Sequence, residues 1–413
     1  MSEWQELLVR DLINTGIIEK PLDGNHGETH PKGEDFIESG IPFVMASDIN
    51  GGKVDLIHCK FISETQASKL RKGFAKSGDV LLTHKASLGR TAIVPELETE
   101  YIMLTPQVTY YRIKDSTRLF NKYLKYYFDS PFFQDTLINH GDAGSTRAYI
   151  GITAQHELPI VLPPLPEQKA IASVLSSLDD KIDLLHRQNK TLEAMAETLF
   201  RQWFIEEAKE DWFTVQVKDI VKQIKPGTNY QPKRLESGIP FLNVRNLKNG
   251  QIDLQGISFI SQEEYERVHK AWKPEVGDVL ISRIGTLGIV AVLGKRDMPM
   301  AVHYNMLVLK PNLTNTAFLY FLLRSQYFQD LYSSKARQSV QEYVAVEDAE
   351  AIELKLPLND ADFVKKQEQF SDLFNKIRAN LAQIQTLEKL RDTLLPKLMS
   401  GEVRVQYQTE EVA

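Results

Sequence analysis

The sequence predicts an α+β protein in which two duplicated domains, each a curved, mainly antiparallel sheet with helices, are separated by two long antiparallel coiled-coil helices in a pseudo-two-fold arrangement. An ordered series of short segments occurs twice along the 413 residues. Within each copy, Gly, Asn and Pro punctuate short strand-like runs. A long stretch with apolar residues at coiled-coil spacing follows each copy.

The internal repeat is visible in matched segments of identical order. Residues 38–43 and residues 236–241 both read ESGIPF, and residues 78–81 and 277–280 both read GDVL. Further matches are SLG at 87–89 with TLG at 286–288, and FQD at 133–135 with FQD at 328–330. So many ordered matches indicate a duplication, and a repeat of this kind determines the fold assignment.

Each copy is expected to contain strands, then a helical segment, then a closing strand. The expected strands of the first copy lie at 41–46, 79–84 and 92–95. The helical segments are expected at 121–139 and 316–333, and the closing apolar runs at 158–164 and 352–357.

The two long amphipathic stretches predict helices that pack on each other. Pro166 is tolerated in the first turn of the first helix, and Pro396 and Gly401 mark the end of the second. Because neither apolar stripe can remain in water, an antiparallel pair is expected. Asn189 on the seam either fixes register and orientation or faces a gap. The seam residues are Leu178, Ile182, Leu185, Asn189, Leu192 and Leu199 in the first helix, and Ile377, Ile384, Leu387 and Leu394 in the second.

These patterns give five expected segments. They are a first domain at 1–165, a central helix at 166–209, a second domain at 210–358, a distal helix at 359–400 and a C-terminal tail at 401–413.

Composition is that of a soluble, cytoplasmic protein. Cys59 is the single cysteine and cannot form an internal disulfide, which suits a reducing compartment. No apolar run is long enough to span a membrane, and the N-terminus does not resemble a secretion signal. The net charge of −6 argues mildly against nucleic-acid binding. However, that expectation concerns the binding face alone.

Signatures of catalysis and metal binding are missing from the sequence. No phosphate-binding P-loop, dinucleotide turn or Asn/Asp-Pro-Pro-aromatic tetrapeptide occurs. His26 and His30 have the spacing of a zinc protease, but the surrounding glycines and Pro31 disfavour the required helix. We therefore expect no metal, no cofactor on this chain and a binding function.

Polar and basic residues gather in loops at the ends of the expected strands. Double-stranded DNA suits two related modules, because equivalent faces recur along the duplex. Lys85 and Arg283 lie in matching glycine-bounded loops. Any one of these residues could equally be a solvated surface residue. The candidate DNA-binding residues are His84, Lys85, Arg90, Ser145, Thr146, Arg147 and Tyr149 in the first copy, and Arg245, Arg283, Tyr304, Asn305, Arg337, Gln338, Ser339, Gln341 and Tyr343 in the second.

Nearly the whole chain resembles the specificity subunit of type I restriction–modification enzymes. The stretch LPPLPEQKAIASVLSSLDDKIDLLHRQNKTLEAMAETLFRQWF at 162–204 is similar to the central spacer helix of that family, and TLEKLRDTLLPKLMSGEV at 386–403 to the distal one. The segments 78–94 and 277–293 are similar to the recurring strand–turn–strand of its target-recognition domains.

The resemblance implies a non-catalytic subunit that reads an asymmetric, bipartite double-stranded DNA target, one half-site per domain. It implies that the spacer helices dock two modification subunits, which methylate adenine at N6 with S-adenosylmethionine. Restriction subunits that use ATP and Mg²⁺ would join them, and this chain would bind no cofactor itself.

Two other functions remain open from the sequence. The chain could be an enzyme with an unrecognised active site, or an interaction protein whose end domains bind no DNA. Salt dependence separates the second of these from DNA binding, since phosphate neutralisation makes DNA affinity fall steeply with salt.

Overall fold

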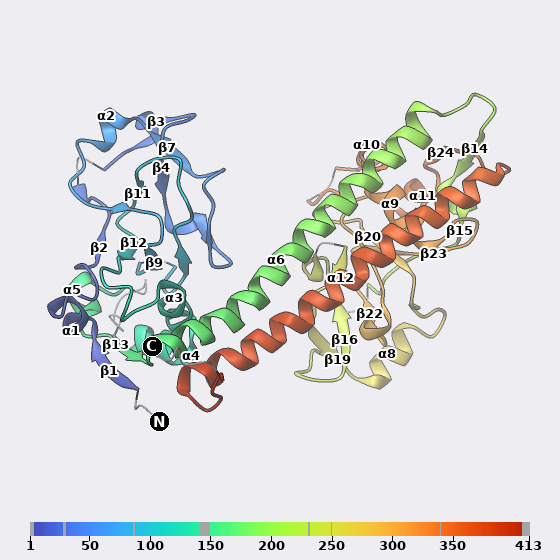
Figure 1. Cartoon of the computed structure of the whole chain (residues 1–413). Helices are drawn as coiled ribbons and strands as arrows, with labels where there is room; N and C mark the ends of the chain where they lie inside the picture. Colours follow the sequence, from blue (N-terminus) through green and yellow to red (C-terminus); the bar gives the residue numbers. More distant parts are fainter. Residues whose placement is uncertain are drawn as a thin grey trace. The chain divides into compact units, whose positions relative to one another are not determined.

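A computed structural model of the chain describes residues 4–27, 30–85, 87–140, 149–229, 232–248, 250–338 and 340–406. The chain forms two compact units, whose elements are labelled in Figure 1. Unit 1 comprises Met1–Leu184 and Ile384–Ala413, and unit 2 comprises Leu185–Gln383. Both long helices therefore contribute residues to both units.

Unit 1 contains short strands in several small, mainly antiparallel sheets. One sheet has the order β10-β9-β12-β2, another has the order β3-β7-β4-β11-β8, and β1 pairs with β13. The bounds are β1 Gln5–Leu8, β2 Leu22–Asp23, β3 Phe36–Ile37, β4 Ile41–Val44, β5 Ile49–Asn50, β6 Lys53–Val54, β7 Lys60–Ile62, β8 Phe74–Ala75, β9 Val80–Thr83, β10 Thr91–Ile93, β11 Ile102–Leu104, β12 Val108–Tyr111 and β13 Pro159–Leu162. Short helices are α1 Val9–Asn14, α2 Glu64–Ala67 and α5 Ile152–Gln155.

Unit 2 repeats this plan. Its sheets have the orders β15-β23-β20-β21 and β19-β16-β22, and β14 pairs with β24 as β1 does with β13. The bounds are β14 Phe213–Gln216, β15 Val221–Pro226, β16 Ile239–Leu242, β17 Leu247–Lys248, β18 Gln251–Ile252, β19 Ser258–Ile260, β20 Val279–Ser282, β21 Val290–Val292, β22 Ala301–Val302, β23 Met306–Pro311 and β24 Glu353–Leu356. Short helices are α7 Val217–Ile220, α8 Gln262–Val268 and α11 Val346–Glu350.

The strand of the ESGIPF repeat makes the same connections in both units. β4 pairs antiparallel with β7 and parallel with β11, and β16 pairs antiparallel with β19 and parallel with β22. Gly40 and Gly238 precede these strands at φ +153° and +136°. A Cβ at Gly40 would lie 2.6 Å from the Ile62 carbonyl oxygen, so this approach requires glycine. The predicted duplication is thus confirmed in the pairing of the strands.

Each predicted helical segment is two helices rather than one. Unit 1 has α3 (Asn121–Asp129) and α4 (Pro131–His140), and unit 2 has α9 (Thr316–Arg324) and α10 (Gln326–Ser334). The break falls at Ser130 and at Ser325, whose backbones are extended. Each serine Oγ accepts a hydrogen bond from the backbone N–H of Phe133 or Phe328, three residues on, and so caps the second helix.

The two long helices are α6 (Leu165–Arg201), continued by a π-helical turn at Gln202–Glu206, and α12 (Ala361–Ser400). The expected bounds of 166–209 and 359–400 therefore extend a few residues too far at the end of α6 and at the start of α12. The predicted end of α12 at residue 400 is confirmed, and Pro396 lies inside the last turns of the helix. Gly401, at φ +74°, follows its last residue.

Within each unit, the segments of α6 and α12 run antiparallel. In unit 1, Arg404 just beyond α12 donates to Glu167 at the start of α6, and Arg391 donates to Asp179 at 3.0 Å. In unit 2, Phe200 and Phe204 near the end of α6 contact Phe370 near the start of α12. Residues early in one helix thus meet residues late in the other.

Equivalent glutamines near the starts of both long helices tie these helices to their units. Gln168 accepts from the Phe120 backbone N–H at 2.9 Å, and Gln367 accepts from the Asn315 N–H at 2.8 Å. Both side chains are buried, so each hydrogen bond satisfies a polar group inside a core. Gln367 therefore performs the same role as Gln168, although the start of α12 lacks the Pro166-Glu167-Gln168 sequence found at the start of α6.

The predicted seam residues are all buried or half-buried. Asn189 does not face a gap, because its Oδ1 accepts a hydrogen bond of 2.8 Å from Asn380 Nδ2. Both side chains are buried, at 6% and 1% exposure. A buried amide pair of this kind satisfies polar atoms only when the two residues are opposite each other, so it favours one register.

We predict that Asn189→Leu destabilises unit 2 by about 1–3 kcal/mol, because it leaves the buried Asn380 amide without its partner. The double variant Asn189→Leu/Asn380→Leu is expected to recover most of this loss, since neither polar group remains. Chemical denaturation of the full chain measures both. A double variant as unstable as the single one would contradict this account of the pair.

Candidate nucleic-acid interface

In unit 1, the structure brings together two of the loops that the sequence singled out. Lys85 forms an isolated antiparallel bridge with Tyr149, and its Nζ lies 5.7 Å from the centre of the Tyr149 ring. The Ile150 N–H donates to the His84 carbonyl at 3.0 Å and so extends the pairing. Lys85 and Tyr149 are both exposed, so they form a cation and an aromatic face side by side at the surface. Ser145, Thr146 and Arg147 lie outside the described residues.

His84 is not a surface residue, contrary to the sequence prediction. Its side chain is 1% exposed, and Nδ1 lies 2.7 Å from the Thr109 hydroxyl. Burial lowers the pKa of His84 to about 4, even though the Asp23 carboxylate lies 3.9 Å from Nε2. The side chain is therefore neutral and packs beneath the loop instead of facing solvent. The residues that enclose it, Asp23 and Thr109, come from distant parts of the chain, so nothing in the local sequence indicates this burial.

Arg90 is exposed but is used to hold a neighbouring turn. Its Nη1 donates to the backbone oxygens of Ala46 and Ile49, each at 3.3 Å, and to Asn50 Oδ1 at 2.9 Å. These bonds fix the turn that follows β4. The guanidinium is thus held in place at the edge of unit 1.

Unit 2 brings together Arg283, Asn305, Arg337 and Tyr343. Tyr343 bridges both Ile284 and Arg337. Arg283 Nε donates to the Val344 carbonyl at 2.9 Å, and its backbone N–H donates to the Asn305 carbonyl at 2.8 Å. The segments that contain Arg283, Asn305 and Tyr343 are therefore joined by backbone bridges and hydrogen bonds, as the segments of Lys85 and Tyr149 are in unit 1.

The bridges correct one predicted equivalence. Lys85 pairs with Tyr149, and the residue that pairs with Tyr343 is Ile284. Arg283 is therefore equivalent to His84. The sequence predicted a match with Lys85, which is one residue further along. The backbone confirms this assignment, since the Ile150 N–H donates to the His84 carbonyl as the Val344 N–H donates to the Arg283 carbonyl. One unit thus has an exposed lysine and a buried histidine where the other has an isoleucine and an arginine.

The remaining predicted residues of unit 2 lie in the loop at 337–343 and around a surface cavity. Arg337 forms a two-pronged ion pair with Asp348, at 2.7 and 2.9 Å, and Gln338 Nε2 donates to Glu342 at 3.0 Å. Gln341 is exposed, and Ser339 lies outside the described residues. Tyr304 packs against His303, with ring centres 4.5 Å apart, while Arg245 and Asn305 line a surface cavity.

Equivalent glutamines hold the loop turns in both units. Gln134 Nε2 donates to the carbonyls of Gly89 and Phe128, and Gln329 Nε2 donates to those of Gly288 and Leu323. The repeated FQD segment thus clamps the repeated turn onto the helix behind it. Sequence analysis recorded this match but gave the glutamines no role, because the hydrogen bonds join segments far apart in the chain.

A family model for the type I restriction modification DNA specificity domain matches residues 1–194 and 209–390. The chain belongs to this family. Among curated relatives, the chain is similar to the MjaIX specificity subunit of Methanocaldococcus jannaschii, with 27% identity over 80% of this chain and 78% of the relative. It is also similar to the EcoKI specificity subunit of Escherichia coli, with 21% identity over 90% and 84% of the two chains.

The fold has a counterpart among solved structures of the same family. The crystal structure of the S subunit of a type I restriction-modification system from M. genitalium aligns with a TM-score of 0.61 and 18% identity, covering 96% of each chain. Its similarity supports the specificity-subunit fold. Among the residues that the structure describes, no helix is long and apolar enough to cross a membrane. In the same part of the chain, no group of His, Cys, Asp and Glu residues is arranged to hold a metal ion.

We predict that His84 makes unit 1 sensitive to mild acid. The folded pKa lies below the ordinary value of 6.5, so the unfolded chain binds the proton more tightly. The stabilisation is complete above the ordinary pKa and is lost as pH falls towards the folded pKa. Between about pH 7 and about pH 5, the wild type should lose about 2 kcal/mol more than His84→Asn.

Native-state hydrogen exchange of the β9 and β12 amides in the full chain measures this difference, because these strands enclose His84. A second histidine of lowered pKa, His269 in unit 2, is unchanged in the variant and so serves as an internal reference. An equal pH dependence of the β9 amides in wild type and variant would show that His84 titrates normally.

Proposed function

We propose that this chain is the DNA-reading subunit of a type I restriction–modification complex and that it recognises an asymmetric, bipartite double-stranded target. Each unit reads one half-site through its loop surface, Lys85 with Tyr149 in unit 1 and Arg283 with Tyr343 in unit 2. The chain itself catalyses no reaction.

The observation that carries this proposal is a constant scaffold with different loops. The strand pairing and the clamping glutamines are the same in both units, while His84 and Lys85 are replaced by Arg283 and Ile284. His84 is buried and Ile284 has no side-chain donor. The side chains that can offer hydrogen bonds to base edges are therefore Lys85 in unit 1 and Arg283 in unit 2, at different positions of the loop. Two such readers in one chain require two unlike half-sites.

We further propose that α6 and α12 dock two modification subunits and that restriction subunits join this assembly. Exposed basic residues on α6 include Lys181, Lys190 and Arg201, of which Arg201 also forms an ion pair with Glu206 at 3.2 Å. S-adenosylmethionine, ATP and Mg²⁺ then belong to the partner subunits.

The proposal predicts a methylation pattern. DNA from a methylation-free host that co-expresses this chain with its neighbouring modification subunit should carry N6-methyladenine at one asymmetric split motif. The mark should be lost when this chain is omitted, and single-molecule sequencing detects it. If both proteins are soluble and associated yet leave no mark, the assignment as a working specificity subunit is overturned.

We predict that Arg283→Ala relaxes recognition at one position of the half-site read by unit 2, at a cost of about 1–3 kcal/mol for the cognate base. Arg283 is half-buried and its Nε is anchored to the Val344 carbonyl at 2.9 Å, so the Nη atoms are the groups that we expect to meet a base edge. Lys85→Ala is the matched control in unit 1 and should affect only the other half-site. Equal weakening on all sequences would instead assign Arg283 to a phosphate.

A further inference from the structure

Unit 2 contains a surface cavity of about 440 Å³ that is lined by two arginines and no acidic residue. The arginines come from separate segments. Arg234 precedes β16, and Arg245 belongs to the turn that follows β16. The other lining residues are Asn243, Val244, Ser258 and Asn305.

Arg234 is held in place by an aromatic ring and a hydroxyl group. Its guanidinium carbon lies 4.0 Å from the centre of the Phe241 ring, and Nη1 donates to Ser258 Oγ at 3.2 Å. Stacking on a ring restricts the guanidinium plane while leaving its edge free to bind an anion. The cavity therefore has one pre-oriented cation on its wall.

The second arginine is close enough to repel the first. The pKa of Arg234 is lowered by burial and by the positive charge of Arg245. No hydrogen bond or ion pair to the Arg245 guanidinium occurs within the described part of the chain. Two like charges that face one cavity become favourable when an anion binds between them.

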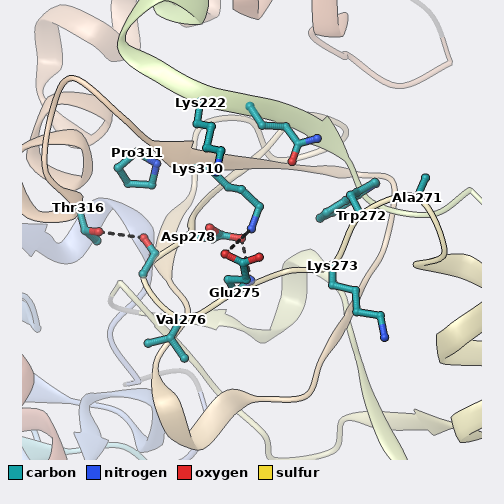
Figure 2. Close-up of a pocket in the computed structure, with 12 residues that line it drawn as sticks. Lys222, Ala271, Trp272, Lys273, Glu275, Val276, Asp278, Lys310, Pro311 and Thr316 are labelled. Atoms are coloured by element: carbon teal, nitrogen blue, oxygen red, sulfur yellow. Dashed lines mark hydrogen bonds and ion pairs between the residues drawn. The ribbon is translucent and has the colours of Figure 1, made fainter.

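In another cavity of unit 2, by contrast, the basic residue is neutralised by carboxylates. That cavity, of about 530 Å³, is lined by Lys310, Glu275 and Asp278 among others. Figure 2 shows Lys310 directed at the two carboxylates, with Nζ at 3.1 Å from Glu275 and 3.3 Å from Asp278. The Arg234–Arg245 cavity has no such carboxylate on its lining.

The polar groups around the arginines suit a phosphate. Ser258 and two asparagines line the cavity beside the guanidinium groups. The Asn305 side-chain oxygen is buried and makes no hydrogen bond of good geometry among the described residues, although the side chain interacts with the adjacent His303. A rotation of this amide exchanges its oxygen and nitrogen, so it can offer a donor to a ligand.

We propose that the Arg234–Arg245 cavity binds a backbone phosphate of the DNA next to the half-site read by unit 2. The proposal rests on the proposed function and adds a contact that positions the duplex without reading its sequence. Arg283 lies next to this cavity, since its backbone N–H donates to the carbonyl of Asn305, which lines the cavity. A phosphate held there would set the approach of the bases to the Arg283 loop.

Unit 1 lacks this site. The position matching Arg234 before the repeated ESGIPF segment is Phe36, and the position matching Arg245 is Ser47. Phe36 belongs to β3 and pairs with β7. The arginine pair of unit 2 therefore has no counterpart at the equivalent positions of unit 1.

The test is a salt titration of the full-length chain binding a mixed-sequence DNA duplex, with Arg245→Gln and Arg234→Gln. Both side chains are exposed, so the variants should fold. Each is expected to weaken binding roughly tenfold at low salt and to lower the slope of log K against log salt by about one. Arg118→Gln, an exposed arginine of unit 1 outside the cavity, is the matched control and should leave the slope unchanged.

The outcomes separate this inference from the proposed function. If the wild-type chain shows no salt-dependent DNA binding, the proposed function fails. If the wild type binds and the cavity variants keep its slope and affinity, the phosphate site is overturned while DNA binding stands. If the variants lose affinity only for duplexes of one sequence, the arginines contact bases, and the phosphate assignment is again wrong.

Discussion

The apolar stripe of α6 is the feature on which both units depend. Ile171, Ala172 and Leu175 are buried in the core of unit 1, whereas Phe200 and Phe204 belong to the aromatic core of unit 2. A helix in water gains most of its stability from burying one face against a core. Because one helix supplies both cores, neither unit can be complete without it. The length of α6 is therefore set by two packing requirements at once.

The scaffold and the loops are stabilised by different interactions, which lets them vary separately. Gln134, Gln329, Gln168 and Gln367 bond to backbone carbonyl or N–H groups, so their partners do not depend on side-chain identity. At Gly89 and Gly288 a Cβ would overlap the oxygen of the clamping glutamine, so these two positions require glycine, while other residues of the loops can change without loss of the clamp. A duplicated domain built this way can change what its surface presents while its core stays the same.

The sequence predicted the duplication, the order of elements and the two long helices, since these depend on local patterns. It did not predict the break between α3 and α4 or the break between α9 and α10. Pro131 after Ser130 is a sequence signal for the first break, whereas Ser325 is followed by no proline. It also placed His84 at the surface, although Asp23 and Thr109, which come from other strands, enclose it. The sequence predicted Lys85 and Arg283 as equivalent positions, which is wrong by one residue. The equivalence is set by the bridges that Lys85 and Ile284 make to Tyr149 and Tyr343.

The net charge of −6 is compatible with a positive binding face, because the local potential depends on which basic groups lack a nearby carboxylate. Many basic groups of this chain are neutralised by an adjacent carboxylate. Arg337 is paired with Asp348, Lys310 with Glu275 and Asp278, and Arg404 with Glu167. The Arg234–Arg245 cavity differs because no carboxylate lines it. Attraction of an anion depends on such local, uncompensated charge within a Debye length of about 8–10 Å. The acidic residues elsewhere on the chain are screened beyond that distance, so the overall balance does not decide where DNA can bind.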